Sequence, residues 1–146
     1  MEMENEINIV EASDFGKKRI GFLCLPGLET FIKPIAEHFS INYNVRTCYS
    51  NSLPELESVI VWSDLIFLEW GNQLAIELSQ KIPVLADKKV ILRIHSYEVL
   101  SDFLKHIKWD VINSTIFVAK HIKDIAVGQI PKLPEFTDIH VVPNGV

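Results

Sequence analysis

The sequence lacks any apolar run long enough to cross a membrane, and it lacks a secretion signal. A membrane-spanning helix needs about 18–20 consecutive apolar residues, whereas the apolar runs here are short and interrupted by charge, such as VIVW and LIFLEW. The opening MEMENEINIVEASDFGKK is acidic and has no apolar segment of the kind that signal peptides carry. We therefore expect a cytoplasmic protein, and we leave open a peripheral membrane association of the full protein.

Cysteine is also scarce in this chain. Cys24 and Cys48 are the only two, and both fall in or just after segments that we expect to be strands. We interpret them as small buried side chains in a reducing compartment, because no second cysteine pair and no nearby histidine would complete a metal site.

Basic residues are fewer than acidic ones. The chain has 14 Lys and Arg against 19 Asp and Glu, which gives a net charge of −5, and the acids are spread along its length. A protein that binds nucleic acid needs a basic face for the phosphate backbone. The composition therefore disfavours nucleic acid as the main partner.

The common nucleotide-binding and metal-binding motifs are missing. There is no G-x-G-x-x-G, no G-x-x-x-x-G-K followed by Ser or Thr, and no acid in VRTCYS to hold a ribose. These absences disfavour a dinucleotide-binding domain and a P-loop. No D-x-D occurs and no His, Asp or Glu cluster has metal-ligand spacing, so we expect no metal.

What the chain does contain is enough material for one folded domain. Hydrophobic residues make up 48% and charged residues 23% of the 146 residues, close to the average for globular proteins. We expect residues 1–17 to be an acidic leader, in which INIV could also add an edge strand. The domain is expected over residues 18–142. We expect an interdomain linker to begin at residues 143–146, within the terminal VVPNGV.

Short apolar runs alternate with helical segments along this domain. Runs such as RIGFLCL and KVILRI are continuously apolar, which is typical of strands buried on both faces of a parallel sheet. The expected strands are 19–25, 44–48, 64–69, 89–94, 114–118 and 138–142. The expected helices are 28–39, with Phe31, Ile35 and Phe39 on one side, 54–63, 72–80, 96–107 and 119–127, and 131–136 is expected to be a loop. Pro34 within the first of these helices indicates a kink or a late helix start.

Six strands joined by helical crossovers predict an α/β fold: a Rossmann-like, doubly wound parallel sheet with helices on both faces. We expect the strand order 3-2-1-4-5-6, in which the first and fourth strands are neighbours. In such sheets ligands bind beyond the carboxyl ends of the strands where the winding reverses. The loops after the first and fourth strands are therefore the first places to look for a site.

These two loops carry polar and small residues next to expected helix starts, where free N–H groups favour an anion or a hydroxyl-rich ligand. PGLET contains Gly27 and Leu28, and HSYE contains His95, Ser96 and Glu98. His95 is the candidate catalytic residue, with a helix-capping or half-buried histidine as the alternative. Glu98 can equally be an acid that only stabilises the first turn of a helix.

The loop after the third strand, LEWGN, is a further candidate. Glu69 could hydrogen-bond a sugar, Trp70 could stack on it, and Gly71 follows directly. The alternative is a buried tryptophan that anchors a turn.

A resemblance to a known protein family extends over about residues 17–146. It is carried by the segments RIGFL with PGLETFIKPIAEHF, SDLIFLEWGNQLAIELS, KKVILRIHSYEV, INSTIFVAKHIKD and IHVVPNGV. The sharpest elements are R-x-H-S-x-E at 93–98, IFVAKHIKD, and the terminal V-P-N-G-V. In this order and spacing the chain resembles the amino-terminal half of retaining GT-B glycosyltransferases of the family-4 type.

The resemblance implies two Rossmann-like domains that face each other across a cleft, with the acceptor bound chiefly by the amino-terminal one and the nucleotide-sugar by the other. Carried over by position, Gly27 would let backbone approach the acceptor or the donor diphosphate. His95 would hydrogen-bond the transferred sugar, Glu69 and Trp70 would line the acceptor groove, and Glu98 would brace its loop.

Leu28, Gly71 and Ser96 complete the substrate-binding set that this resemblance implies. The donor-phosphate Arg and Lys and the Glu-x7-Glu motif of the family belong to the other half. The first loop has the single glycine Gly27, where many members of the family have two or more.

The implied activity is transfer of a sugar from a nucleotide-sugar to a glycan, lipid or small-molecule acceptor with retention of configuration. The departing diphosphate can take the acceptor's proton, so a pair of flanking carboxylates is not required. The implied partners are donor, acceptor and a carboxyl-terminal domain, with no resident cofactor, and we expect this chain alone to be inactive. The alternatives are a non-catalytic binding module and half of a sugar-nucleotide epimerase.

Overall fold

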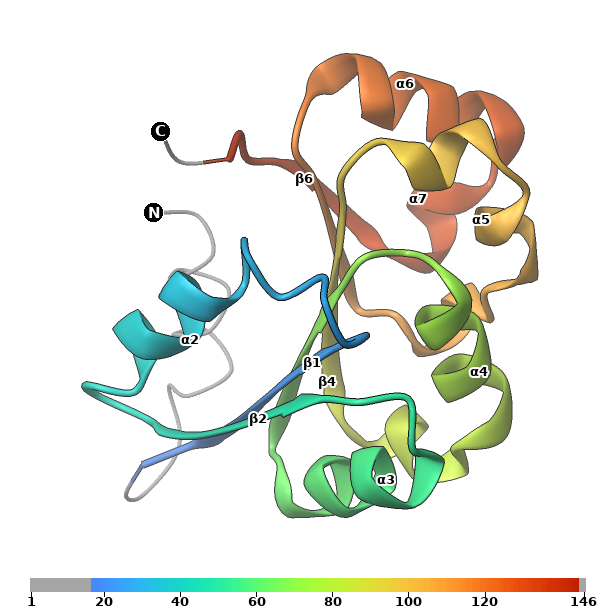
Figure 1. Cartoon of the computed structure of the whole chain (residues 1–146). Coiled ribbons are helices and arrows are strands. Elements are labelled where there is room, and N and C mark those ends of the chain that lie inside the picture. Colours follow the sequence, from blue (N-terminus) through green and yellow to red (C-terminus); the bar gives the residue numbers. More distant parts are fainter. Residues whose placement is uncertain (1–16, 145–146) are drawn as a thin grey trace.

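The computed structural model describes residues 17–144 and shows one sheet of six parallel strands with helices packed on it (Figure 1). The expected α/β, Rossmann-like doubly wound class is confirmed. The strands are β1 (Arg19–Cys24), β2 (Asn44–Tyr49), β3 (Leu65–Glu69), β4 (Lys89–Ile94), β5 (Ser114–Phe117) and β6 (Asp138–Val141). Each end lies within one residue of the position expected from the sequence.

Most of the expected leader, including INIV, and the last two residues of the expected linker lie outside the described residues. The domain limits of 18–142 therefore stay a prediction.

The expected strand order is wrong. The order in the sheet is β2-β1-β3-β4-β5-β6, and β1 pairs with β3, with Phe22 opposite Phe67, instead of with β4. In the expected order the third strand pairs with the second, whereas in the structure β3 pairs with β1 on the side away from β2. A continuously apolar strand fits either position, so the sequence pattern did not distinguish the two orders. The winding reverses between β1 and β3, so the crevice at the carboxyl ends lies there, with β4 next to it.

Alternate side chains of the strands enter two separate apolar layers. Phe22 and Phe67 belong to one layer together with Phe39 of α2. Leu23 and Leu68 belong to the other, together with side chains of α3, α4 and α6. Figure 1 shows α2 on one side of the sheet and α3, α4, α5 and α6 on the opposite side.

The longer helices are α2 (Lys33–Phe39), α3 (Leu53–Trp62), α4 (Gln73–Lys81) and α6 (Lys120–Gln129). α2 begins at Lys33 and not at residue 28, which is the late start that Pro34 indicated, because proline suits the first turn of a helix and not its interior. Phe31 consequently precedes the helix and is 45% exposed, whereas Phe39 is buried. The expectation that Phe31 and Phe39 lie on one side of the same helix is therefore wrong.

The expected helix 96–107 is divided into the 3-10 turn η2 (Tyr97–Leu100) and the short α5 (Phe103–His106). Ser101 between them is extended, and its hydroxyl donates to the carbonyl oxygens of Tyr97 and Glu98 at 3.3 and 3.2 Å. Such local side-chain bonds compete with the helical hydrogen-bond ladder. This division leaves the residues after β4 in a compact turn instead of a long helix.

Three further helical pieces were not expected: η1 (Pro83–Asp87), η3 (Trp109–Val111) and α7 (Leu133–Phe136). α7 falls inside the expected loop 131–136, and it carries Pro134 in its first turn, where proline is compatible with a helix.

Candidate functional site

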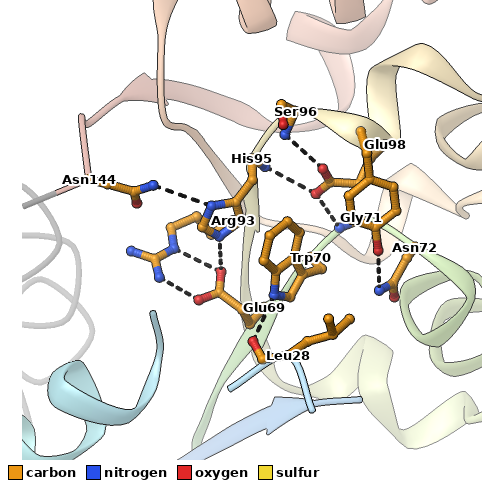
Figure 2. Close-up of polar contacts among 11 residues, drawn as sticks. Leu28, Glu69, Trp70, Gly71, Asn72, Arg93, His95, Ser96, Glu98 and Asn144 are labelled. Carbon is orange, nitrogen blue, oxygen red and sulfur yellow. Dashed lines mark hydrogen bonds and ion pairs between the residues drawn. The ribbon is translucent and has the colours of Figure 1, made fainter. Parts of the chain in front are cut away.

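The neighbouring strands β3 and β4 end together at the carboxyl edge of the sheet, and residues at their ends form a polar cluster (Figure 2). Glu69 is the last residue of β3, Arg93 lies directly opposite it on β4, and His95 follows β4. Because alternate residues of a strand share a face, Arg93 and His95 can both reach Glu69. The winding therefore brings three charged or titratable side chains to one point.

Glu69 binds both partners through its two carboxylate oxygens. Arg93 Nε donates to Oε1 at 2.8 Å, and Arg93 Nη2 pairs with Oε2. His95 Nε2 lies 2.8 Å from Oε1. All three side chains are almost completely buried, with exposed fractions of 0% for Glu69 and 4% for Arg93 and His95.

The carboxyl of Glu69 is held in its charged form. Burial alone would favour the protonated acid, but the hydrogen bonds from Arg93 and His95 and their charges outweigh it and lower the pKa of Glu69 below its usual value. Glu69 and Arg93 thus form a buried ion pair with no net charge.

His95 is held from two sides. Its Nε2 lies 2.8 Å from Glu69 Oε1, and its Nδ1 lies 3.4 Å from the side-chain amide of Asn144. A contact of 3.4 Å is long for a hydrogen bond. Both ring nitrogens therefore face a polar group of the protein, one closely and one loosely.

Trp70 covers the histidine ring. Its ring is stacked on that of His95 with 3.8 Å between centroids, and its Nε1 donates to the carbonyl oxygen of Leu28 at 3.0 Å. Trp70 has a φ of 76°, a left-handed conformation that costs of order 1–3 kcal/mol in a residue other than glycine. These contacts link the loops after β1, β3 and β4, as a tryptophan that anchors a turn would.

Glu98 braces the loops after β3 and β4. Its carboxylate accepts from the backbone N–H of Gly71 at 3.1 Å, of His95 at 3.0 Å and of Ser96 at 2.9 Å. Glu98 has no exposed surface, so it is more than a solvated acid in a first turn. The bracing contacts are present, while its part in substrate binding stays a prediction.

Gly71 is set among the packed side chains behind this brace. A Cβ there would lie 3.1 Å from Ile94 and 3.2 Å from Leu104. Gly71 therefore allows close packing of the β3 loop, and it is absent from the wall of the pocket described below.

A pocket of about 240 Å³ lies beside the histidine. Its wall includes His95, Trp70 and Ser96 of the predicted site, together with Phe31 and Asn144. The remaining wall residues are Val118, Ala119, His121 and Ile122, around the start of α6.

Gly27 is not brought into this pocket. It is exposed, has a φ of 85° and would have nothing within 4 Å of an added Cβ. It serves the tight turn after β1. Leu28 enters the site only through its carbonyl oxygen, which accepts from Trp70.

Five residues of this region were not named as site residues from the sequence: Phe31, Asn72, Arg93, Tyr97 and Asn144. Arg93 had a usable signal, because it lies two residues before His95 on one face of a strand. Asn72 caps α4 and donates to the Tyr97 hydroxyl at 2.8 Å. Phe31 and Asn144 are brought to the site only by the path of the chain.

Within residues 17–144, no group of three or more His, Cys, Asp or Glu side chains is arranged to hold a metal ion. In the same part of the chain, no helix combines the length and the apolar character needed to span a bilayer. Comparisons with protein-family models, curated proteins and solved structures found no match.

Proposed function

We propose that this chain is the acceptor-side half of a retaining GT-B glycosyltransferase, a cytoplasmic enzyme that transfers a sugar from a nucleotide-sugar to a glycan, lipid or small-molecule acceptor. Two findings support the proposal. The fold is of the class that each half of such an enzyme requires. The R-x-H-S-x-E motif behind the resemblance is also one physical unit, in which Arg93, His95 and Glu98 all have defined partners.

The observation that carries the proposal is the placement of His95. Its Nε2 lies 2.8 Å from Glu69, its ring is stacked on Trp70, and its Nδ1 faces Asn144 at a pocket wall. In the proposed enzyme a hydroxyl of the transferred sugar donates to Nδ1 in place of the amide of Asn144, whose contact is long at 3.4 Å. This is the contact expected of a residue that orients the transferred sugar.

The rest of the proposed chemistry does not require a catalytic carboxylate here. Glu69 is committed to Arg93 and His95, and Glu98 to three backbone N–H groups. In retaining transfer of this kind the departing diphosphate, held by the second domain, takes the proton of the acceptor hydroxyl. This chain would position sugar and acceptor and exclude water.

A second candidate function is a non-catalytic binding module. It is favoured by one observation, namely that His95 is 4% exposed and covered by Trp70. Such an enclosed ring can have the structural role of stabilising the buried Glu69–Arg93 pair, without any contact with a substrate. The two functions differ in whether the loss of the His95 nitrogens affects turnover.

The test uses the full-length gene product and compares His95→Phe with His121→Phe, which changes another histidine of the same pocket wall. Transfer from radiolabelled nucleotide-sugars and the anomeric configuration of the product are measured. We expect His95→Phe, which keeps the stacked ring, to lower kcat about 100-fold or more, with His121→Phe close to wild type. Equal activity of the two variants would leave His95 a structural role, and absence of any transfer would favour the binding module.

A further inference from the structure

One side of the sheet has little helical cover. Within residues 17–144, α2 alone of the helical elements contributes buried side chains to the layer of Phe22 and Phe67, and all the others contribute to the layer of Leu23 and Leu68. We propose that the amino-terminal INIV (residues 7–10) packs across β4 and β5 on the α2 side of the sheet. This interaction goes beyond the proposed function and does not rest on it.

α2 is too small to cover its side of the sheet. Six strands spaced about 4.8 Å apart make a sheet about 24 Å wide. A helix is about 10–12 Å across, and the seven residues of α2 make it about 10 Å long. α2 contacts β2, and its Phe39 stacks on Phe22 of β1 with 6.3 Å between ring centroids. It therefore covers β1 and β2 and leaves β4 and β5 to another segment.

β4 and β5 carry apolar side chains on the α2 side. Ile91 of β4 and Ile116 of β5 belong to the same layer as Phe22, and their exposed fractions are only 0% and 1%. Leu28 and Trp70 also pack against this layer, but they follow the carboxyl ends of β1 and β3. The middle of β4 and β5 thus requires a further apolar cover.

INIV is the segment of the chain that fits this requirement. It lies outside the described residues, and three of its four side chains, Ile7, Ile9 and Val10, are apolar. Residues 11–18 join it to Arg19 at the start of β1, and these eight residues can span up to about 26 Å. β4 and β5 lie two and three strand spacings from β1, or about 10 and 14 Å. The connection is therefore long enough for INIV to reach both strands.

The charges of the leader agree with this position. Residues 1–16 contain five acids and no Lys or Arg. Lys89 is half-buried and shares a face of β4 with Ile91, because alternate residues of a strand share a face. On β6, by contrast, Asp138 shares a face with Val142 of the same layer and would repel the leader. The charges thus favour β4 and β5 over β6.

Addition of INIV to an edge of the sheet is the alternative. β2 forms one edge, and it carries the exposed Arg46, a charged residue of the kind that protects an edge strand from pairing. An INIV strand paired with β2 would also leave Ile91 and Ile116 without their cover. The need for cover therefore favours packing on the face of the sheet.

A cover over β4 also affects the candidate site. Arg93 lies two residues after Ile91 on the same face of β4 and is 4% exposed in its ion pair with Glu69. INIV over Ile91 would keep water away from this pair on the side of the strand's amino end. The leader would thus support the site without contacting a substrate.

The experiment compares the 146-residue chain with a serine variant that carries Ile7→Ser, Ile9→Ser and Val10→Ser. The matched control carries Asn5→Ser and Asn8→Ser, which change polar residues of the same segment. Isoleucine, leucine and valine methyl groups are isotopically labelled. Two-dimensional NMR measures nuclear Overhauser contacts between methyl groups and their relaxation by a soluble gadolinium chelate.

In the wild type and the control we expect contacts between methyl groups of INIV and those of Ile91 or Ile116, with both isoleucines protected from the chelate. In the serine variant we expect both to lose protection, while Leu92, on the other side of β4, stays protected. Urea unfolding should show an unfolding equilibrium constant about tenfold or more higher than in the wild type, the effect of exposing one fully buried aliphatic side chain. The contacts in the wild type decide the question even if the serine variant does not fold.

Any of four results would overturn the proposal. The first is exposure of Ile91 and Ile116 to the chelate in the wild type, and the second is equal protection in the serine variant. The third is contact of INIV with β2 instead of β4 and β5. The fourth is protection that is lost on about tenfold dilution, because it would show that a second copy of the chain supplies the cover.

Discussion

Glu69 is a carboxylate with no exposed surface, and its two strongest partners are Arg93 on the next strand and His95 two residues further along the chain. Removing both charges from water is costly, and the pair repays that cost only through close, well-oriented hydrogen bonds. Removing one partner is a different matter, because it leaves the other charge buried and unbalanced. We therefore expect the loss of one of these side chains to lower the free energy of unfolding strongly and in a pH-dependent way.

We expect Glu69→Gln to lower the free energy of unfolding by about 3–5 kcal/mol at pH 7, since Arg93 would remain buried without a counter-ion. The pKa of Glu69 is lowered in the folded protein. Its contribution is therefore fully present above the usual glutamate value and is lost as the pH falls through the folded-state pKa. The difference between wild type and variant should shrink below about pH 4. Urea unfolding at pH 7 and pH 3 measures it.

The control is Asp64→Asn, which breaks the more exposed pair of Asp64 with Arg19. Exposed pairs contribute about 0–1 kcal/mol, so this variant should unfold close to the wild type at pH 7. A loss in Glu69→Gln no larger than that of the control would contradict a stabilising role for the buried pair.

At the scale of elements, the carboxylate of Glu98 joins the loops after β3 and β4. The residues after β4 form only a 3-10 turn and a four-residue helix. Glu98 in that turn reaches back to His95 and Ser96 and across to Gly71. One carboxylate therefore determines the position of two loops that carry candidate site residues.

We expect Glu98→Gln to loosen these two loops selectively. The glutamine amide would replace one acceptor oxygen by a donor that faces backbone N–H groups, at a cost of about 1–3 kcal/mol. Amide hydrogen exchange should show a loss of protection of about tenfold or more at Gly71, His95 and Ser96, with smaller changes in the central strands.

Glu57→Gln on the exposed side of α3 is the matched control and should leave exchange at these amides unaltered. A uniform loss of protection across the sheet in Glu98→Gln would show that Glu98 supports the whole domain and not the two loops.

At the scale of the whole molecule, the position of a strand in the sheet decides how accessible its cysteine is to solvent. β1 lies between β2 and β3, and Cys24 at its end has no exposed surface. Burial, and then the nearby charges of Glu69 and Glu29, raise the pKa of the Cys24 thiol to about 12. Cys48 on β2 is only half-buried, and burial also raises its pKa.

We expect thiol labelling at pH 8 to distinguish the two cysteines. With a pKa of about 12, only about one Cys24 thiol in ten thousand would be ionised at that pH. Labelling of the Cys48→Ser variant, which keeps Cys24 alone, should therefore depend on global unfolding and accelerate with urea along the unfolding transition. Labelling of Cys24→Ser should be faster in native buffer and depend little on urea.

Equal labelling rates of the two variants in native buffer would contradict the central position of β1. Circular dichroism during the urea series supplies the unfolding transition against which the labelling of Cys48→Ser is compared.

Local patterns in the sequence were sufficient for the elements of this fold. Continuous apolar runs such as that of β4 are typical of strands covered on both faces, which is why the strand limits and the parallel class could be predicted. The same patterns placed Glu69, Trp70, His95 and Glu98 at strand ends, because a strand end is a local property.

Only the tertiary structure decided which strand ends meet. The order of β1, β3 and β4 depends on the direction in which each crossover leaves the sheet, and an apolar strand does not encode that direction. The contact of Asn144 with His95 joins residues far apart in the chain, and Phe31 faces the pocket because α2 begins at Lys33. Periodicity within one segment carries no information on such contacts, since they arise from packing between segments.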